Sequence, residues 1–257
     1  MRKLAVLAAV TTTALGGGLA SVAAAGPPAT DANGNFSVLD VDVFPPRAAN
    51  PLGVTIGFHL FSGNRLTGQR QPASQSVTLR FPGFHENGVF FPKCPLPTTA
   101  QQVGSPRCSR ASQVGRGTAE ADARPGVSGF IPVNNVRVFN GSPRGGNPTL
   151  IFLGTATIGA QTIHTEIDFV ARPAGGGFNL VLLPAPAGTP SGLFSLTRVD
   201  VTAGKTLVVR RGVGRLLVSL IVPPRTCPPA GWGFSVTNVF TTGASLTARD
   251  VQSCVRA

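Results

Sequence analysis

The chain has little of what a helical protein needs. Of its 257 residues, 32 are glycine and 23 are proline, and both types destabilise helix interiors. After the first residues, no long window keeps a helical hydrophobic period. A Gly-X-Y repeat is also missing, which excludes collagen. Since 42% of the residues are hydrophobic, the composition argues against wholesale disorder and favours a globular, loop-rich, all-β protein.

Sequence motifs of nucleophilic catalysis are missing as well. The sequence contains no G-x-S-x-G, no S-x-x-K and no H-E-x-x-H motif. Only three histidines and ten acidic residues are present for acid–base work. We therefore expect no catalytic residue, no metal and no cofactor. Because catalytic groups assemble in space rather than in sequence, an enzyme stays open as the alternative.

Residues 1–25 have the layout of a secretory signal peptide. A basic start, Met1-Arg2-Lys3, precedes an apolar stretch over residues 4–19, and small residues end the segment at Ala25. A membrane anchor is the competing interpretation, but the apolar stretch is short and rich in alanine, glycine and threonine. We expect cleavage near Ala25 and a mature protein that is secreted or associated with the cell wall, with no transmembrane segment.

Four cysteines in an exported chain predict disulfides. Three pairings are possible, and sequence proximity favours Cys94 with Cys108 and Cys227 with Cys254. A zinc site is the competing interpretation, but no C-x-x-C spacing is present. The only tryptophan, Trp232, follows the third cysteine closely, and we expect it in the core beneath the second disulfide.

Short alternating segments predict antiparallel strands with one buried side. In Phe36–Phe44, for example, leucine and valine occupy every second position from Leu39 to Val43. The continuously apolar segment Leu216–Val222 predicts a central strand. About a dozen such segments, ended by proline and glycine clusters, predict an all-β, disulfide-stapled antiparallel β-sandwich.

One compact domain over residues 35–257 is the expected organisation, after a flexible leader at 26–34. The Pro/Gly-rich segment 141–148 is the best internal boundary, but it is short for a linker between two sandwiches. The segment 92–114 is the longest irregular one, and its two cysteines would staple it.

Basic residues outnumber acidic ones by twelve, and loss of Arg2 and Lys3 with the signal would leave 12 − 2 = 10. An affinity for anionic envelope polymers or lipid headgroups explains this excess, and so does a high-GC genome that favours arginine codons. Nucleic acid is not expected, because aromatic residues do not interleave with the basic ones. The candidate binding residues form two clusters in the sequence, namely Lys93, Arg107, Arg110 and Arg116, and Arg210, Arg211, Arg215 and Arg225.

Two polar groups are the candidates for the alternative, a secreted hydrolase or a carbohydrate-active or carbohydrate-binding protein. His85 and Glu86 lie in a predicted turn between aromatic residues. His164, Glu166 and Asp168 share one face of a predicted strand, which we expect to be a solvated face.

The segment Cys108–Ala119, which reads C-x-x-x-S-x-V-G-x-G-x-A, resembles a group of exported proteins of high-GC Gram-positive bacteria. Phe91–Cys94, Val138–Gly141 and Cys227–Trp232 are also similar to that group. The resemblance implies export and a β-rich fold and carries no catalytic residue. In physical terms, the glycines within Cys108–Ala119 permit a tight turn or a bulge after the staple.

Overall fold

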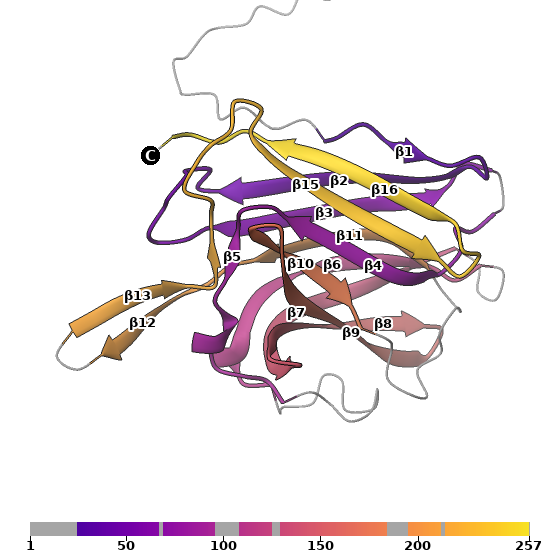
Figure 1. The fold of residues 1–257 in the computed structure, drawn as a ribbon. Helices are drawn as coiled ribbons and strands as arrows, with labels where there is room; N and C mark the ends of the chain where they lie inside the picture. Colours follow the sequence, from indigo (N-terminus) through magenta and orange to yellow (C-terminus); the bar gives the residue numbers. More distant parts are fainter. Residues whose placement is uncertain are drawn as a thin grey trace, which may run out of the picture.

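The computed structural model in Figure 1 confirms the predicted all-β antiparallel class. The helical elements that it describes are short 3-10 turns, η1 (Gly88–Phe90) and η3 (Arg110–Ser112). The predicted signal peptide lies almost entirely outside the described part of the chain. The structure describes residues 25–66, 69–95, 108–124, 129–183, 195–211 and 214–256.

A single antiparallel sheet carries most of the fold. Its strands, in spatial order, are β1 (Ala29–Thr30), β2 (Asn35–Phe44), β3 (Thr55–Asn64), β11 (Ser195–Ala203), β6 (Gln113–Asp122), β7 (Phe130–Arg144), β8 (Asn147–Ile158), β9 (Gln161–Ala174), β10 (Gly177–Leu182), β4 (Ser74–Phe81), β15 (Trp232–Phe240) and β16 (Ser245–Gln252). The segment 141–148, considered above as a boundary, lies in the β7–β8 hairpin.

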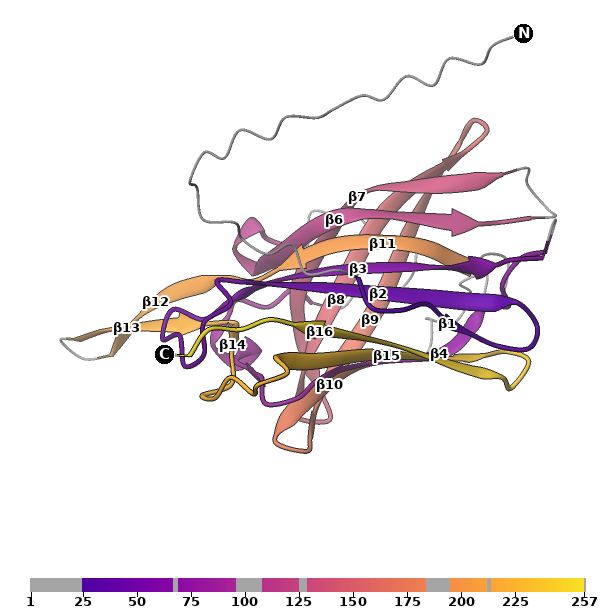
Figure 2. The same cartoon turned by 90° about the horizontal axis from the view of Figure 1, so that it is seen from above.

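The sheet curls until its two ends meet, so that one nearly closed, barrel-like sheet supplies both walls around the core (Figure 2). At the seam, the backbone N–H of Val41 in β2 donates to the Asp250 carboxylate of β16 at 2.9 Å. The N–H of Gly26 donates to the carbonyl of Leu39 at 3.1 Å. Residues 26–34, expected as a flexible leader, thus contribute β1 and contacts at the seam.

The core inside the sheet is rich in aromatic rings. Phe81 and Phe178 stack with their centroids 4.9 Å apart, and Phe84 meets Trp232 edge to face at 5.3 Å. Trp232 is buried, and its indole N–H donates to the carbonyl of Thr226. The expected place of this tryptophan in the core is confirmed.

Both expected disulfides are present, Cys94–Cys108 and Cys227–Cys254. The first holds the irregular segment onto β7, where Cys94 donates its N–H to the carbonyl of Asn140. The second joins the loop before β15 to the chain after β16.

Two small sheets complete the fold, β5 (His85–Glu86) with β14 (Ile221–Val222) and β12 (Thr206–Arg211) with β13 (Gly214–Ser219). The β12–β13 hairpin extends away from the curled sheet in both views (Figures 1 and 2). The predicted central strand Leu216–Val222 is wrong, because this segment divides between β13 and β14 and its first residues are exposed. Apolar continuity suggested burial, but the hairpin carries these residues out of the core.

Removal of the Cys227–Cys254 disulfide should destabilise the protein. The bridge closes a loop with a sequence separation of 27, and loop-closure entropy for that length amounts to about 3–4 kcal/mol. We expect the double variant Cys227→Ala/Cys254→Ala to lose about that much free energy of unfolding in a guanidinium titration. A loss below about 1 kcal/mol would show that this bridge does little for the fold.

Candidate functional site

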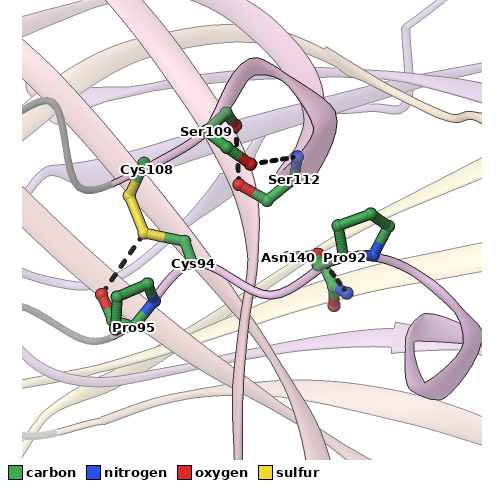
Figure 3. Close-up of a disulfide and its surroundings, with 7 residues drawn as sticks. All are labelled: Pro92, Cys94, Pro95, Cys108, Ser109, Ser112 and Asn140. Atoms are coloured by element: carbon green, nitrogen blue, oxygen red, sulfur yellow. Dashed lines mark hydrogen bonds between the residues drawn. A yellow bond between two sulfur atoms is a disulfide. The ribbon is translucent and has the colours of Figure 1, made fainter.

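The chain that leads into the first disulfide is anchored to β7 by a buried asparagine, Asn140 (Figure 3). The Asn140 side-chain amide nitrogen lies 2.9 Å from the carbonyl oxygen of Gly88 and 3.1 Å from those of Phe91 and Pro92. Because the Asn140 side chain is fully buried, water cannot take its place as the hydrogen-bond donor to these carbonyls. Asn140 therefore fixes the course of the chain that leads into Cys94.

A second hydrophobic cluster lies under the disulfide, on the outer face of the sheet. It contains Cys94, Phe139, Ile151 and Leu153. Successive residues of a strand point to opposite faces, so Ile151 and Leu153 point away from the main core, to which the intervening Leu150 belongs. The disulfide thus covers apolar surface that would otherwise face water.

Arg110 is positioned by the short turn that follows the disulfide. In η3, the N–H of Ser112 donates to the Ser109 hydroxyl at 3.3 Å, and the Ser112 hydroxyl donates to the Ser109 carbonyl at 2.7 Å (Figure 3). These bonds satisfy the first turn of the helix and fix the place where Arg110 leaves the backbone.

Two hollows of about 430 and 380 Å³ adjoin on the outer face, beside the disulfide. Both are lined by Gln113 and Arg137, and Arg116 lines the larger and Arg110 the smaller. We call this surface the arginine groove, defined by Arg110, Gln113, Arg116 and Arg137. It extends from His59 on β3 to the first disulfide.

Strand register brings two of these arginines together. Arg116 of β6 lies directly opposite Arg137 of β7 on one side and Thr202 of β11 on the other. Directly paired residues project to the same face of a sheet, and all three are exposed. Arg137 was missed by the sequence analysis, because it lies 21 positions from Arg116 and only the pairing of β6 with β7 makes them neighbours.

Irregular ladders shape this part of the sheet. The β6–β7 register shifts between Gln113 and Gly115 and again between Gly117 and Ala119, so the bulge expected from the glycines is confirmed. A Cβ atom on Gly117 would lie 2.0 Å from the carbonyl oxygen of Asp200. Glycine is therefore needed where β11 passes close to β6.

A histidine between two carboxylates borders the larger hollow. His59 Nδ1 lies 2.9 Å from Asp200 Oδ1, and its Nε2 lies 3.5 Å from Asp42 Oδ2. Arg198 donates to the other Asp200 oxygen at 2.5 Å. Burial raises the pKa of Asp200, but the bonds from His59 and Arg198 outweigh it and hold this pKa below its usual value. Both ring nitrogens of His59 therefore face carboxylates of neighbouring strands.

The arginines of the groove have no acidic partner in the described chain. Arg110, Arg116 and Arg137 form no ion pair there, whereas Arg124, Arg144 and Arg198 each pair with an aspartate. Asp200 borders the groove, but His59 and Arg198 already engage its oxygens. The groove is therefore a concave surface with uncompensated positive charge.

The other predicted basic residues lie elsewhere. The Lys93 ammonium donates to the carbonyl of Gly88, and burial lowers its pKa. Arg107 lies outside the described residues. The remaining predicted arginines are Arg210 and Arg215 on the β12–β13 hairpin, Arg211 at the end of β12 with its side chain outside the described part, and Arg225 in the loop after β14.

His85 and Glu86 do not converge. They are adjacent residues of β5, so their side chains leave opposite faces, and His85 is exposed while Glu86 is mostly buried. Glu86 accepts the N–H of Gly88 at 2.6 Å. Burial raises the pKa of Glu86 to about 7 despite this bond and the nearby Lys93.

The expectation of a solvated face for His164, Glu166 and Asp168 is wrong for the two acids. Only His164 is exposed, while Glu166 and Asp168 are buried opposite Leu153 and Ile151 of the second hydrophobic cluster. Alternation predicted the shared face, but the pairing of these acids with apolar residues of β8 has no local sequence signature. Burial raises the pKa of Glu166 to about 7, with Asp168 raising it further, and burial also raises the pKa of Asp168 despite Arg144 at 3.6 Å.

Comparison with protein-family models, with curated proteins and with solved structures found no match. Among the described residues, no three histidine, cysteine or acidic side chains are grouped so as to hold a metal ion. No helix in the same part of the chain is long and apolar enough to cross a membrane. Function has to be inferred from the groove itself.

Asn140 should be intolerant of an isosteric change to aspartate. An oxygen would then replace the amide nitrogen beside the carbonyls of Gly88, Phe91 and Pro92, and a charge would be buried. We expect Asn140→Asp to cost more than about 3 kcal/mol of unfolding free energy. The control Asn147→Asp, in the exposed β7–β8 turn, should cost less than about 1 kcal/mol. Equal losses in chemical denaturation would contradict the anchoring role.

Glu166 should make the folded protein less stable as pH rises. Its pKa is raised from 4.5 to about 7, so the folded state favours the neutral carboxyl, and this stabilisation is lost as pH rises between these values. We expect Glu166→Gln to remove that loss, so that the variant gains stability relative to the parent as pH increases across the range. If the denaturation midpoints of the parent and of Glu166→Gln keep a constant difference from pH 4.5 to 7, the pKa of Glu166 is not raised in the folded state.

Proposed function

We propose that the protein is exported and that it binds an anionic polymer of the cell envelope through the arginine groove, without catalysis. One observation carries this proposal: Arg110, Arg116 and Arg137 line adjoining hollows and lack carboxylate partners among the described residues. Guanidinium groups bind phosphate and carboxylate in a bidentate geometry. An anion therefore provides the partners that the protein itself does not.

Neutral donors beside the arginines narrow the class of ligand. Gln113, Thr118, Thr202 and Asn135 line the larger hollow with amide and hydroxyl groups. Such groups suit a chain that carries hydroxyls between its charges, such as a polyol phosphate or an acidic glycan. Since two open hollows adjoin along the strands, the groove fits an extended polymer better than an enclosed small molecule.

Export is supported by the amino-terminal sequence and by the cysteines. Residues 1–25 have the signal-peptide layout, and every cysteine of the chain is paired in a disulfide. Disulfides of this kind form and persist in oxidising compartments outside the cytoplasm.

The alternative, a secreted hydrolase or carbohydrate-active protein, stays a prediction without support from a shared site. Neither hollow of the groove is lined by His85, Glu86, His164, Glu166 or Asp168. His59 borders the groove, but carboxylates face both of its ring nitrogens, which suits a structural role.

Neutralising the groove should weaken polymer binding. We expect the double variant Arg116→Gln/Arg137→Gln to bind poly(glycerol phosphate) about tenfold or more weakly than the parent, because each charge-assisted contact contributes at least about 1 kcal/mol. Isothermal titration at low salt measures this, and the affinity of the parent should fall as salt rises.

Arg80→Gln is the matched control, since Arg80 is exposed on β4 and does not line the groove. It should bind like the parent. The control removes one charge and the groove variant removes two, so a loss of binding free energy in the control about half that of the groove variant would mean that net charge alone attracts the polymer. Absence of binding by the parent at low salt would contradict the proposal outright.

A further inference from the structure

The β12–β13 hairpin exposes large aliphatic side chains to solvent. Val208, Leu216 and Leu217 are 60%, 51% and 48% exposed. Val208 and Leu217 lie directly opposite each other in the ladder and therefore share one face of the hairpin. Exposed apolar side chains grouped on a projecting element are typical of interaction sites.

The hairpin is held firmly at its base. The Thr206 and Ser219 hydroxyls both donate to the carbonyl of Leu52. Lys205, just before β12, donates to the carbonyls of Ala111 and Gln113 at 2.5 and 3.0 Å. The hairpin thus projects as an element fixed to the strands that carry the arginine groove, and its exposed face keeps a defined direction.

Like charges face each other beyond the aliphatic pair. Arg210 of β12 lies directly opposite Arg215 of β13, on the same face as Val208 and Leu217. A directly opposed pair of like charges destabilises a sheet. Neither arginine forms an ion pair within the described part of the chain. An anionic partner would relieve this repulsion.

The aliphatic pair and the arginine pair on one face of the hairpin together narrow the possible partners. A hydrated polyanion would satisfy Arg210 and Arg215 but would leave Val208 and Leu217 in water. A second copy of the chain would cover the aliphatic pair but would bring further arginines against the first two. An anionic bilayer surface presents phosphates and acyl chains within one layer, and it matches both pairs together.

We propose that the β12–β13 hairpin binds the surface of an anionic phospholipid membrane. Val208 and Leu217 lie against the acyl boundary, and Arg210 and Arg215 contact lipid phosphates, with their alkyl stems along the apolar layer. This binding site is separate from the arginine groove and does not depend on the polymer proposed above. Through Lys205, a hairpin on the membrane holds the groove close to that surface.

Vesicle co-sedimentation with the mature protein tests the proposal. The probe is vesicles of equal parts phosphatidylglycerol and phosphatidylcholine, and vesicles of phosphatidylcholine alone are the neutral comparison. We expect binding to the anionic vesicles only, and a loss of about tenfold in partitioning for Arg210→Gln/Arg215→Gln. Arg80→Gln, on β4, should partition like the parent.

The aliphatic pair gives a second, independent arm. Val208→Thr/Leu217→Thr places a β-branched residue at both strand positions, so the hairpin should still form, and we expect a loss of about tenfold in partitioning. Val251→Thr is the control, since Val251 is 51% exposed on β16. Unchanged partitioning of the Val208→Thr/Leu217→Thr variant would overturn the proposal.

Two further outcomes would overturn the proposal in favour of another partner. If the parent dimerises in gel filtration and loses both the dimer and vesicle binding only when Val208 and Leu217 are replaced, the hairpin serves self-association. If Arg116→Gln/Arg137→Gln abolishes vesicle binding while the hairpin variants retain it, the groove is the lipid site. Vesicle binding that survives the groove variant supports the hairpin, whether or not the groove binds a polymer.

Discussion

The positions of the few carboxylates determine where positive charge is left free. The chain has only ten acidic side chains and twenty-two basic ones, and several of the acids form contacts that hold the fold together. Asp122 pairs with Arg124 at 2.6 Å, Asp200 pairs with Arg198, and Asp250 accepts a backbone N–H at the seam of the sheet. With these acids engaged, the arginines of the groove and of the hairpin lack acidic partners in the described chain. Both surfaces therefore carry positive charge that no acid of the described chain compensates.

Local features of the fold follow from the sequence because their causes are local. Alternation in Phe36–Phe44 fixes which side of β2 is buried, and loop length favours the observed disulfide pairing. The neighbourhood of Arg116 and Arg137 depends on the register of β6 and β7 and on two bulges, none of which has a local sequence signature. The burial of Glu166, opposite Leu153 of β8, likewise has no local sequence signature.

Both proposed binding surfaces are joined through one lysine. Lys205 donates to the carbonyls of Ala111 and Gln113, the segment that carries Arg110 and begins the groove, and β12 starts at the next residue. Burial lowers the pKa of Lys205, which fits a structural donor rather than a free surface cation. A ligand on the groove and a surface under the hairpin would therefore be held by a single rigid body.

The central claim is that arginines of the groove engage anionic envelope material. Co-sedimentation of the mature protein with purified, delipidated envelope polymer across a salt series tests it most directly. The account predicts retention at low salt that disappears as screening increases, and much weaker retention when Arg116 and Arg137 are neutralised. A failure to retain the protein at any salt concentration would contradict it, and so would retention that is unaffected by salt and by replacement of these two arginines.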